Sequence, residues 1–194
     1  MRSISLKVLI LDNYDSFTYN LVHLLQEIGI SELDVVLNDK LELERVDIYD
    51  KIILSPGSGL PKDAGIMSEL LNRWAETKSI LGVCLGHQGI VERFGGQLSN
   101  MDTVIHGKSS TIKILDSRES LFLNLPSLFE VGRYHSWVAD RDTLPDCLRV
   151  TAEDKKGHIM AIKHEHFDIK GVQFHPESIL TQYGVEMLKN WLYL

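Results

Sequence analysis

A short apolar stretch that runs straight into a cysteine flanked by glycines constrains the fold most. It reads Ile80-Leu-Gly-Val-Cys-Leu-Gly-His-Gln-Gly89. The first four residues suit a buried strand, and Gly86 and Gly89 flank a turn that opens a helix ending at Gly95-Gly96. Such a strand-to-helix bend would push the Cys84 side chain out at the edge of a sheet, like a nucleophile elbow with sulfur in place of oxygen.

The start of the following helix would favour the thiolate form of Cys84, because free N–H groups and the positive end of the helix dipole face the sulfur. The alternative is a buried core cysteine, which is what most lone cysteines are. Glycines on both sides argue against that alternative, because a packed core position does not require them.

Apolar runs alternate with helical patterns in the first half of the chain. Strands are expected at residues 6–11, 34–37, 51–54 and 80–83. One helix has Phe17, Leu21, Leu24, Leu25 and Ile28 on one face, with Asp15 or Ser16 as N-cap and Gly29 as its stop. Another has Ile66, Leu70, Leu71 and Trp74 on one face. This alternation predicts right-handed crossovers and a mostly parallel sheet.

Short or alternating strand patterns replace the helices beyond Gly96. They occupy residues 111–115, 129–131, 148–151, 159–162 and 171–174, and a closing helix is expected from about Thr181 to Leu194. The predicted fold class is therefore α/β, a mostly parallel central sheet with helices on both faces and added antiparallel strands. We expect a single domain over residues 1–194, because no linker, repeat or low-complexity segment interrupts the chain.

Composition excludes several classes of function. The net charge of −7 argues against nucleic acid or an anionic membrane surface as the main partner. Residues 1–7 lack the apolar core of a leader, and no segment approaches transmembrane length. The two cysteines, Cys84 and Cys147, suggest neither a disulfide framework nor a metal cluster, and no cofactor is expected. A cytoplasmic protein with reduced thiols is expected.

A second motif supplies a candidate base for the thiol. In Gly171-Val-Gln-Phe-His-Pro-Glu-Ser178, His175 and Glu177 stand two residues apart, so an extended backbone turns their side chains to the same face. A carboxylate beside an imidazole holds its tautomer and stabilises the imidazolium. Alone, this stretch would more often be an exposed turn, but a thiol nucleophile needs a distant base of this kind. His87, beside the elbow, is the competing candidate, and Glu177 favours His175.

A third motif is the loop Ser55-Pro-Gly-Ser-Gly-Leu-Pro61, which follows a predicted strand. Glycine lets the backbone approach a ligand closely and turn its N–H groups inward. One such N–H, together with that of Leu85, would form an oxyanion hole. The loop alone would serve equally well as a plain turn.

Taken together, six stretches of the chain resemble the signature blocks of the class I glutamine amidotransferases. They lie in family order at residues 11–18, 55–61, 82–88, 106–109, 134–136 and 171–178. Within that family, the chain resembles the small subunits that serve anthranilate synthase and aminodeoxychorismate synthase. As a set these blocks are highly specific, whereas each alone is a weak or moderate signal.

The resemblance implies a catalytic triad of Cys84, His175 and Glu177, with an oxyanion hole formed by Gly57 and Leu85. It also implies L-glutamine as the substrate, hydrolysed through a γ-glutamyl thioester to glutamate and ammonia. No metal or cofactor is implied. The implied binding residues are Gly57, Ser58, Gly59, Gln88, Ser136 and Trp137.

The resemblance further implies a hetero-oligomer with a larger synthase subunit that binds chorismate and uses the ammonia for anthranilate or 4-amino-4-deoxychorismate. The blocks 12–18 and 106–109 would face that partner. Three positions depart from the family pattern: Ser58 stands where Pro is more frequent, Trp137 where Leu is usual, and Gly89 where Ala is common. None removes a catalytic group, but the resemblance leaves the exact pocket shape and the choice of partner open at these positions.

Three other functions are compatible with parts of the pattern. One is a glutaminase that serves another synthetase, and a second is a γ-glutamyl cysteine hydrolase on the same fold. A third, a catalytically silent binding subunit, is disfavoured because every triad position is filled. His158, His164 and His166 are expected at the surface rather than in a metal site, and Cys147 is expected to be structural.

Overall fold

The computed structural model describes residues 6–194. Residues 1–5, which include most of the stretch examined for a leader, lie outside the described part. Nine strands form one sheet in the order β2-β1-β3-β4-β9-β8-β7-β5-β6. Their bounds are β1 Lys7–Asn13, β2 Glu32–Leu37, β3 Lys51–Gly57, β4 Ser79–Val83, β5 Leu98–Ile114, β6 Leu128–Ala139, β7 Leu148–Asp154, β8 Ile159–His164 and β9 Ile169–Val172.

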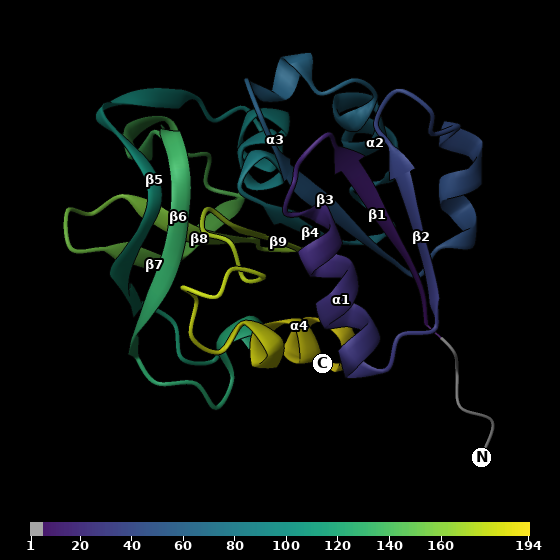
Figure 1. The fold of residues 1–194 in the computed structure, drawn as a ribbon. Helices are drawn as coiled ribbons and strands as arrows, with labels where there is room; N and C mark the ends of the chain where they lie inside the picture. Colours follow the sequence, from purple (N-terminus) through teal and green to yellow (C-terminus); the bar gives the residue numbers. More distant parts are fainter. Residues whose placement is uncertain (1–5) are drawn as a thin grey trace.

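The sheet divides into a parallel and an antiparallel half. Strands β2, β1, β3, β4 and β9 pair in parallel. Strands β8, β7, β5 and β6 continue from β9 with antiparallel pairing, and they curl away from the parallel half (Figure 1). This confirms the predicted α/β fold, a parallel core with antiparallel strands added.

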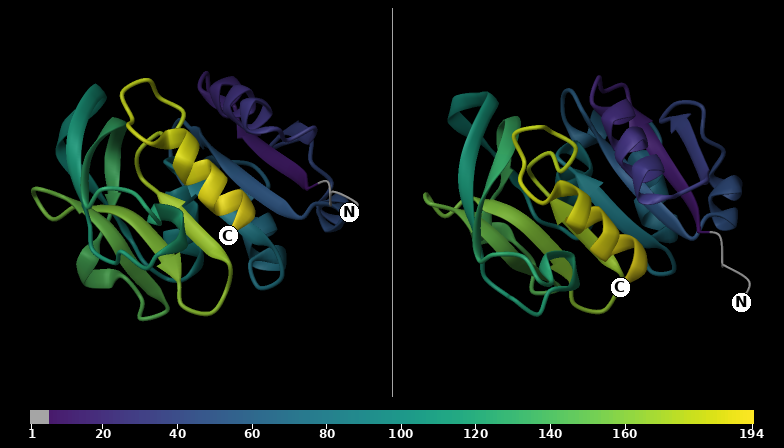
Figure 2. Two further views of the ribbon diagram at one scale, coloured as in Figure 1. Left: turned by 90° about the horizontal axis from the view of Figure 1, so that it is seen from below. Right: turned by 60° about the horizontal axis from the view of Figure 1, so that its bottom comes forward.

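Helices cover both faces of the parallel half. They are α1 Thr18–Ile28, α2 Met67–Trp74, α3 Leu85–Arg93 and α4 Gly184–Tyr193. Short 3-10 helices occupy Leu43–Ile48 (η1), Pro61–Asp63 (η2), Ser120–Phe122 (η3) and Arg141–Thr143 (η4). Figure 2 shows α1 and α4 side by side on one face.

Alternation along the central strands divides the core between the two faces. Val8 and Ile10 of β1 pack with the buried residues of α1 and α4. Leu9 and Leu11 face the other way and pack with those of α2 and α3. Because successive strand side chains point to opposite faces, one continuous apolar run supplies both layers. The resulting three layers leave the carboxyl ends of β1, β3, β4 and β9 at one edge.

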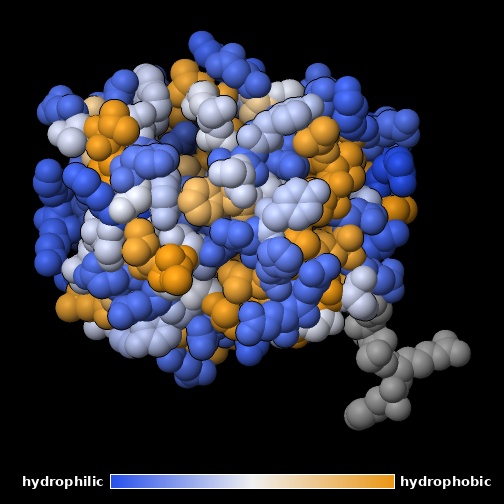
Figure 3. Space-filling model, viewed as in Figure 1, coloured by the Kyte–Doolittle hydropathy of each residue, from blue (hydrophilic) through white to orange (hydrophobic). Residues whose placement is uncertain are grey.

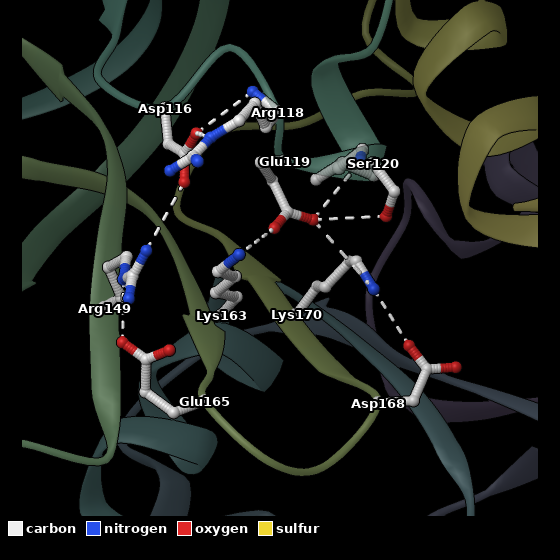
Figure 4. A network of polar contacts seen from close by, with 10 residues as sticks. Asp116, Arg118, Glu119, Ser120, Arg149, Lys163, Glu165, Asp168 and Lys170 are labelled. Carbon is white, nitrogen blue, oxygen red and sulfur yellow. Dashed lines mark hydrogen bonds and ion pairs between the residues drawn. The ribbon is translucent and has the colours of Figure 1, made fainter.

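Ion pairs occupy the opposite, amino end of the parallel strands (Figure 4). The Glu119 carboxylate accepts from the backbone N–H of Leu121 at 3.2 Å and lies 3.1 Å from the Lys163 ammonium. Lys170 in β9 pairs with Asp168 at 2.8 Å and lies 4.0 Å from Glu119. These contacts fasten the loop after β5 to β8 and β9.

Three local predictions are wrong. Helix α1 starts later than expected, with Phe17 and not Asp15 or Ser16 at its N-cap. The Asp15 carboxylate instead accepts from the Phe17 N–H at 2.8 Å, so the polar side chain closes the preceding turn. The last helix begins at Gly184 instead of Thr181, because the Thr181 hydroxyl is held by the carbonyl of His175 at 2.5 Å. His164 is buried, with its ring stacked on Phe167.

Strand β5 is much longer than residues 111–115, the part that the sequence indicated. It spans Leu98–Ile114 and pairs with most of β6, with two interruptions in register. Its first part is largely polar and exposed, so it lacks the apolar alternation from which strands are predicted.

Across residues 6–194, no helix is long and apolar enough to cross a membrane. On the face in Figure 3, hydrophobic residues form separate small patches among hydrophilic ones.

Candidate active site

Cys84 occupies a strained elbow between β4 and α3. Its backbone has φ 50° and ψ −95°, a conformation that residues with a side chain seldom adopt. Such a position costs roughly 1–3 kcal/mol and persists only where the surroundings impose it. Here the Cys84 N–H donates to the carbonyl of Val172 in β9 at 2.8 Å, and the Cys84 carbonyl accepts from the backbone N–H of Gln88 at 3.1 Å. The sulfur is thereby held at the carboxyl end of the parallel strands.

The glycines of the elbow serve close packing rather than a turn. Gly86 and Gly89 lie within α3 and do not flank a turn before it. A Cβ on Gly86 would collide with the backbone oxygen of Leu54 in β3, and one on Gly82 would collide with Gly86. Two glycines therefore let α3 begin directly against β3 and β4.

His175 and Glu177 meet as a buried pair beside this elbow. The chain bends after β9, and the His175 N–H donates to the carbonyl of Gly132 in β6 at 3.0 Å. The ring Nδ1 lies 2.6 Å from Glu177 Oε1 and donates its hydrogen to that carboxylate. The rings of Phe17 and Tyr134 pack against the imidazole at centroid distances of 5.2 and 4.8 Å. The carboxylate and the aromatic rings fix both the tautomer and the orientation of His175.

The pKa of His175 is raised to about 10. Burial by itself lowers it, but the Cys84 sulfur and the Glu177 carboxylate outweigh burial and stabilise the imidazolium. The ring Nε2 has no hydrogen bond of ordinary geometry to a described residue, although Cys84 lies near enough to act on the pKa of the ring. One nitrogen of His175 is thus bound to Glu177 and the other is left for the reaction.

A cavity of about 190 Å³ opens beside the sulfur. Its walls include Cys84 and all the binding residues that the sequence suggested, namely Gly57, Ser58, Gly59, Gln88, Ser136 and Trp137. Gly57 and Leu85 are close neighbours, since a Cβ on Gly57 would lie 2.6 Å from Leu85 Cδ2. The Leu85 side chain therefore packs against Gly57, and Gly57 and Cys84 line the same cavity.

Cavity size alone would not have selected this site. A hollow of about 440 Å³ lies between β5 and the hairpin at Lys155, and one of about 620 Å³ lies between α1 and the loop after His175. Neither is lined by Cys84. Within residues 6–194, no group of three His, Cys, Asp or Glu side chains is arranged to hold a metal ion.

Sequence reasoning did not single out three residues that shape the site. Asn13, at the end of β1, donates through Nδ2 to the Ser55 carbonyl at 2.8 Å and braces the loop before Gly57. Gln173 donates to Cys84 Sγ at 3.6 Å. His135 donates to the Trp137 carbonyl at 2.9 Å. All three stand in or beside the recognised blocks, but only the fold shows which atoms they contact.

The competing base, His87, lies away from the cleft. Its side chain is fully buried in α3, and burial lowers its pKa to about 4, so the ring is neutral near pH 7. It packs against Gly171 of β9, whose added Cβ would lie 2.8 Å from the ring Nδ1. Cys147 is half-buried among apolar residues of the α2 and α3 side.

The fold and this cleft define a class of protein, the glutamine amidotransferases. The model of the family Glutamine amidotransferase class-I matches residues 9–194, and the chain belongs to that family.

More particular relatives divide between two names. The chain is 44% identical to "Aminodeoxychorismate/anthranilate synthase component 2" of Bacillus subtilis over 187 residues, 95% of each chain. It is also 44% identical to "Aminodeoxychorismate synthase component 2" of Escherichia coli, over 96% of this chain and 99% of that one. Among solved structures, it is similar to a "putative gmp synthase" protein from Thermoplasma acidophilum, with a TM-score of 0.87, 26% identity, and coverage of 98% of this chain and 94% of that one.

Proposed function

We propose that this chain is the glutaminase subunit of a chorismate-using synthase, in which Cys84 hydrolyses L-glutamine and the ammonia passes to a larger partner subunit. One observation carries the proposal: a strained cysteine faces a cavity beside an imidazole that is bound to a carboxylate at 2.6 Å. The catalytic unit is the whole domain of residues 1–194. Its nucleophilic thiol suits the reducing cytoplasm.

In the first half-reaction, Cys84 Sγ attacks the side-chain amide carbon of glutamine. His175 Nε2 already holds the proton that came from the thiol, so the thiolate attacks, and the carbonyl oxygen becomes an oxyanion that accepts from the N–H groups of Gly57 and Leu85. His175 then gives the proton to the amide nitrogen, the C–N bond breaks, and ammonia leaves behind a γ-glutamyl thioester. Glu177 stabilises the imidazolium throughout.

In the second half-reaction, His175 takes a proton from water, and the resulting hydroxide adds to the thioester carbon. The same two N–H groups hold the second oxyanion. The C–S bond breaks, which restores the thiolate beside the protonated His175, and glutamate is released. No metal or cofactor enters either half-reaction.

The amino-acid end of glutamine would lie against Gln88, Ser136 and Trp137. These residues line the cavity with the loop Gly57, Ser58 and Gly59. The Trp137 carbonyl already accepts from Gln88 Nε2 at 3.0 Å and His135 Nδ1 at 2.9 Å. Its two lone pairs are therefore occupied, and recognition by this segment falls to other groups, such as its N–H groups.

The partner would dock around the mouth of the cleft. Three large side chains beside the blocks are left exposed: Tyr14 in the block 12–18, Val104 in the cavity wall beside the block 106–109, and Ile179 just after the triad, which is 99% exposed. Apolar side chains at a surface are stabilised when a partner covers them. A docking site there would let ammonia reach the partner without meeting solvent.

The test separates glutamine use from ammonia use. The chain is mixed with each candidate synthase subunit, chorismate and either glutamine or an ammonium salt, and anthranilate and 4-amino-4-deoxychorismate are measured. We expect one candidate to form product from glutamine. With Cys84→Ser, product should still form from ammonium but not from glutamine, because the partner keeps its own active site.

Two outcomes would overturn the proposal. Undiminished glutamine hydrolysis by Cys84→Ser would show that Cys84 is not the nucleophile. Hydrolysis of γ-glutamyl peptides in preference to glutamine, unaffected by any synthase subunit, would instead assign a γ-glutamyl hydrolase.

A further inference from the structure

A buried pair of amide side chains connects the wall of the cleft to the sulfur of Cys84. Gln173 follows β9 directly, and its side chain is fully buried. Its Nε2 lies 3.6 Å from Cys84 Sγ, and its Oε1 lies 3.2 Å from Gln88 Nε2. The backbone N–H of Gln173 donates to the Met160 carbonyl of β8 at 2.9 Å, so the residue is anchored to the sheet.

The direction of these hydrogen bonds follows from the Trp137 carbonyl. A carbonyl oxygen can only accept, so Gln88 must present its NH₂ group to it, at 3.0 Å. The second hydrogen of that group points to Gln173, which must therefore present its oxygen to Gln88. The remaining end of Gln173, its NH₂ group, then faces the sulfur.

A guanidinium supports the same arrangement from behind. Arg133 Nε donates to His135 Nε2 at 3.1 Å, which leaves the hydrogen of the neutral ring on Nδ1 for the Trp137 carbonyl. Arg133 is itself held by the Asp154 carboxylate at 2.7 Å. The Trp137 carbonyl is thus held by His135, whose ring cannot turn over because a guanidinium only donates hydrogen bonds and a carbonyl only accepts them.

We propose that Gln173 is a further catalytic residue, whose amide N–H donates to Cys84 Sγ, favours the thiolate and aims it at the bound substrate. A hydrogen bond to an ionised acceptor is stronger than one to a neutral acceptor, so this donor acts most on the reactive form. An amide does not take up a proton at neutral pH, so the thiol proton still goes to His175. The reaction written above is otherwise unchanged.

Gln88 joins this donor to the binding of substrate. Both hydrogens of its NH₂ group are used, by Trp137 and by Gln173, so only its Oε1 remains for the amino-acid end of glutamine. The same pair of amides would therefore hold the substrate at one end and the nucleophile at the other. This part rests on the proposed function, whereas the hydrogen bond to sulfur does not.

The test measures the reactivity of the thiol without glutamine. Gln173→Glu replaces the donor by a group of equal size that repels a thiolate, and Gln173→Met removes the donor. Alkylation of the Cys84 peptide by iodoacetamide is followed against pH by mass spectrometry, which separates it from Cys147. We expect the pH midpoint to rise by about one unit or more, with alkylation at pH 7 slowed about tenfold.

The matched control is Asn190→Asp on α4. It makes the same change from amide to carboxylate at a side chain that, among residues 6–194, hydrogen-bonds the Leu121 and Leu123 carbonyls and not Cys84. We expect the wild-type pH midpoint. A folded Gln173 variant with that same midpoint would overturn the proposal.

Activity adds a second readout. We expect kcat for glutamine hydrolysis to fall about tenfold with KM little changed, because the donor acts on the reacting sulfur and not on the substrate. If wild-type protein hydrolyses no glutamine, alone or with a synthase subunit, while the alkylation midpoint still moves in the variants, the proposed function fails and the hydrogen bond stands.

Wild-type protein provides the test if neither variant folds. The side-chain amide resonances of Gln173 are followed by ¹⁵N NMR as pH rises and after alkylation of Cys84. We expect them to shift with the same midpoint as alkylation and to lose that response once the sulfur is blocked. Resonances that ignore both treatments would overturn the proposal.

Discussion

The two ends of the parallel sheet place charged side chains in different surroundings. At the amino end, Glu119, Lys163, Lys170 and Asp168 pair with one another, and the Glu119 carboxylate also accepts a backbone N–H (Figure 4). At the carboxyl end, Glu177 Oε2 and His175 Nε2 are buried without a hydrogen-bond partner among the described residues. The charged groups named at the amino end thus have partners, whereas two atoms of the His175–Glu177 pair are left without one.

Backbone conformation divides in the same way. Cys84 has a positive φ of 50° at the carboxyl end, whereas the strand residues at the amino end are regular. Strain and unsatisfied groups lower stability, so they persist where they perform chemistry. The comparison therefore assigns activity to the carboxyl end and stability to the amino end.

The largest expected effect comes from His175→Ala. It should lower glutamine hydrolysis by about a thousandfold or more, because proton transfer in both half-reactions is lost. The variant also leaves the buried Glu177 carboxylate unpaired, so the unfolding free energy should fall as well, and activity is compared on folded protein. Steady-state kinetics and thermal unfolding on the same preparation check this, with the exposed His166→Ala as the control. If His166→Ala loses activity to the same extent, the loss in His175→Ala cannot be assigned to the carboxyl end of the sheet.

Acid should weaken the protein through its carboxyl end. The pKa of His87 is lowered to about 4 and that of His135 to about 3, in both cases first by burial, from the ordinary 6.5. The unfolded chain therefore takes up these protons before the folded chain does, and stability falls as pH drops from 6.5. For His87 the loss by pH 4 is about 3 kcal/mol. His175 acts in reverse, since its raised pKa gives stability that is lost as pH rises through about 10.

Denaturant unfolding at several pH values measures this slope. His87→Met should remove part of the loss between pH 6.5 and 4. The amino end should contribute little there, because the pKa of Asp168 is lowered below its ordinary 3.8; burial alone would raise it, but the Lys170 ammonium and the Ser79 hydroxyl prevail. A wild-type stability that stays flat over that interval would contradict the account.

A smaller effect is expected from Glu119→Ala at the amino end. It removes the acceptor for the Leu121 N–H and the ion-pair partner of Lys163. The Lys163 side chain is partly exposed, so water can solvate its ammonium group in the variant. We expect a loss of about 1–2 kcal/mol in unfolding free energy with unchanged glutaminase activity. Glu165→Ala breaks an exposed pair with Arg149 and should change stability by less than about 0.5 kcal/mol. A loss of activity in folded Glu119→Ala would show that the amino end of the sheet also affects catalysis, contrary to the division proposed here.

A difference similar to or smaller than that of Glu119→Ala tests the backbone strain at Cys84. Cys84→Gly and Cys84→Ala both remove the sulfur, but only glycine adopts φ 50° without strain. We expect the glycine variant to be more stable than the alanine variant by about 1 kcal/mol, the reverse of the usual order. At position 79, where β4 begins, alanine should be the more stable of the two. Equal stability of the two Cys84 variants would show that the backbone at this position is not strained.

Much of the fold followed from the apolar pattern of the chain. Strands β1 to β4 and helices α1 to α3 were predicted in type and order, because buried parallel strands give continuous apolar runs between amphipathic helices. Strand β5 was predicted only in part, since its exposed first residues are held by pairing with β6 rather than by burial. The start of α4 was missed because contacts with His175, distant in sequence, hold Thr181.

The candidate site was predicted at the level of residues but not of atoms. The motifs indicated Cys84, His175 and Glu177, and the fold brings them to one edge of the sheet. No pattern indicated that Gln173 would face the sulfur, because its role depends on a carbonyl at Trp137, 36 positions earlier in a different strand. Burial of His164 was missed for a related reason, since its aromatic neighbours include Phe94 from the end of α3.

Covalent labelling with a diazoketone analogue of glutamine distinguishes a nucleophilic Cys84 from an ordinary thiol, since each chain carries an internal control in Cys147. After digestion and mass spectrometry, we expect one adduct, on the Cys84 peptide; glutamine should slow its formation increasingly as its concentration rises, and Cys84→Ser should abolish it. Labelling of Cys147 instead, or labelling of Cys84 that glutamine does not slow, would contradict the role of Cys84 as the nucleophile.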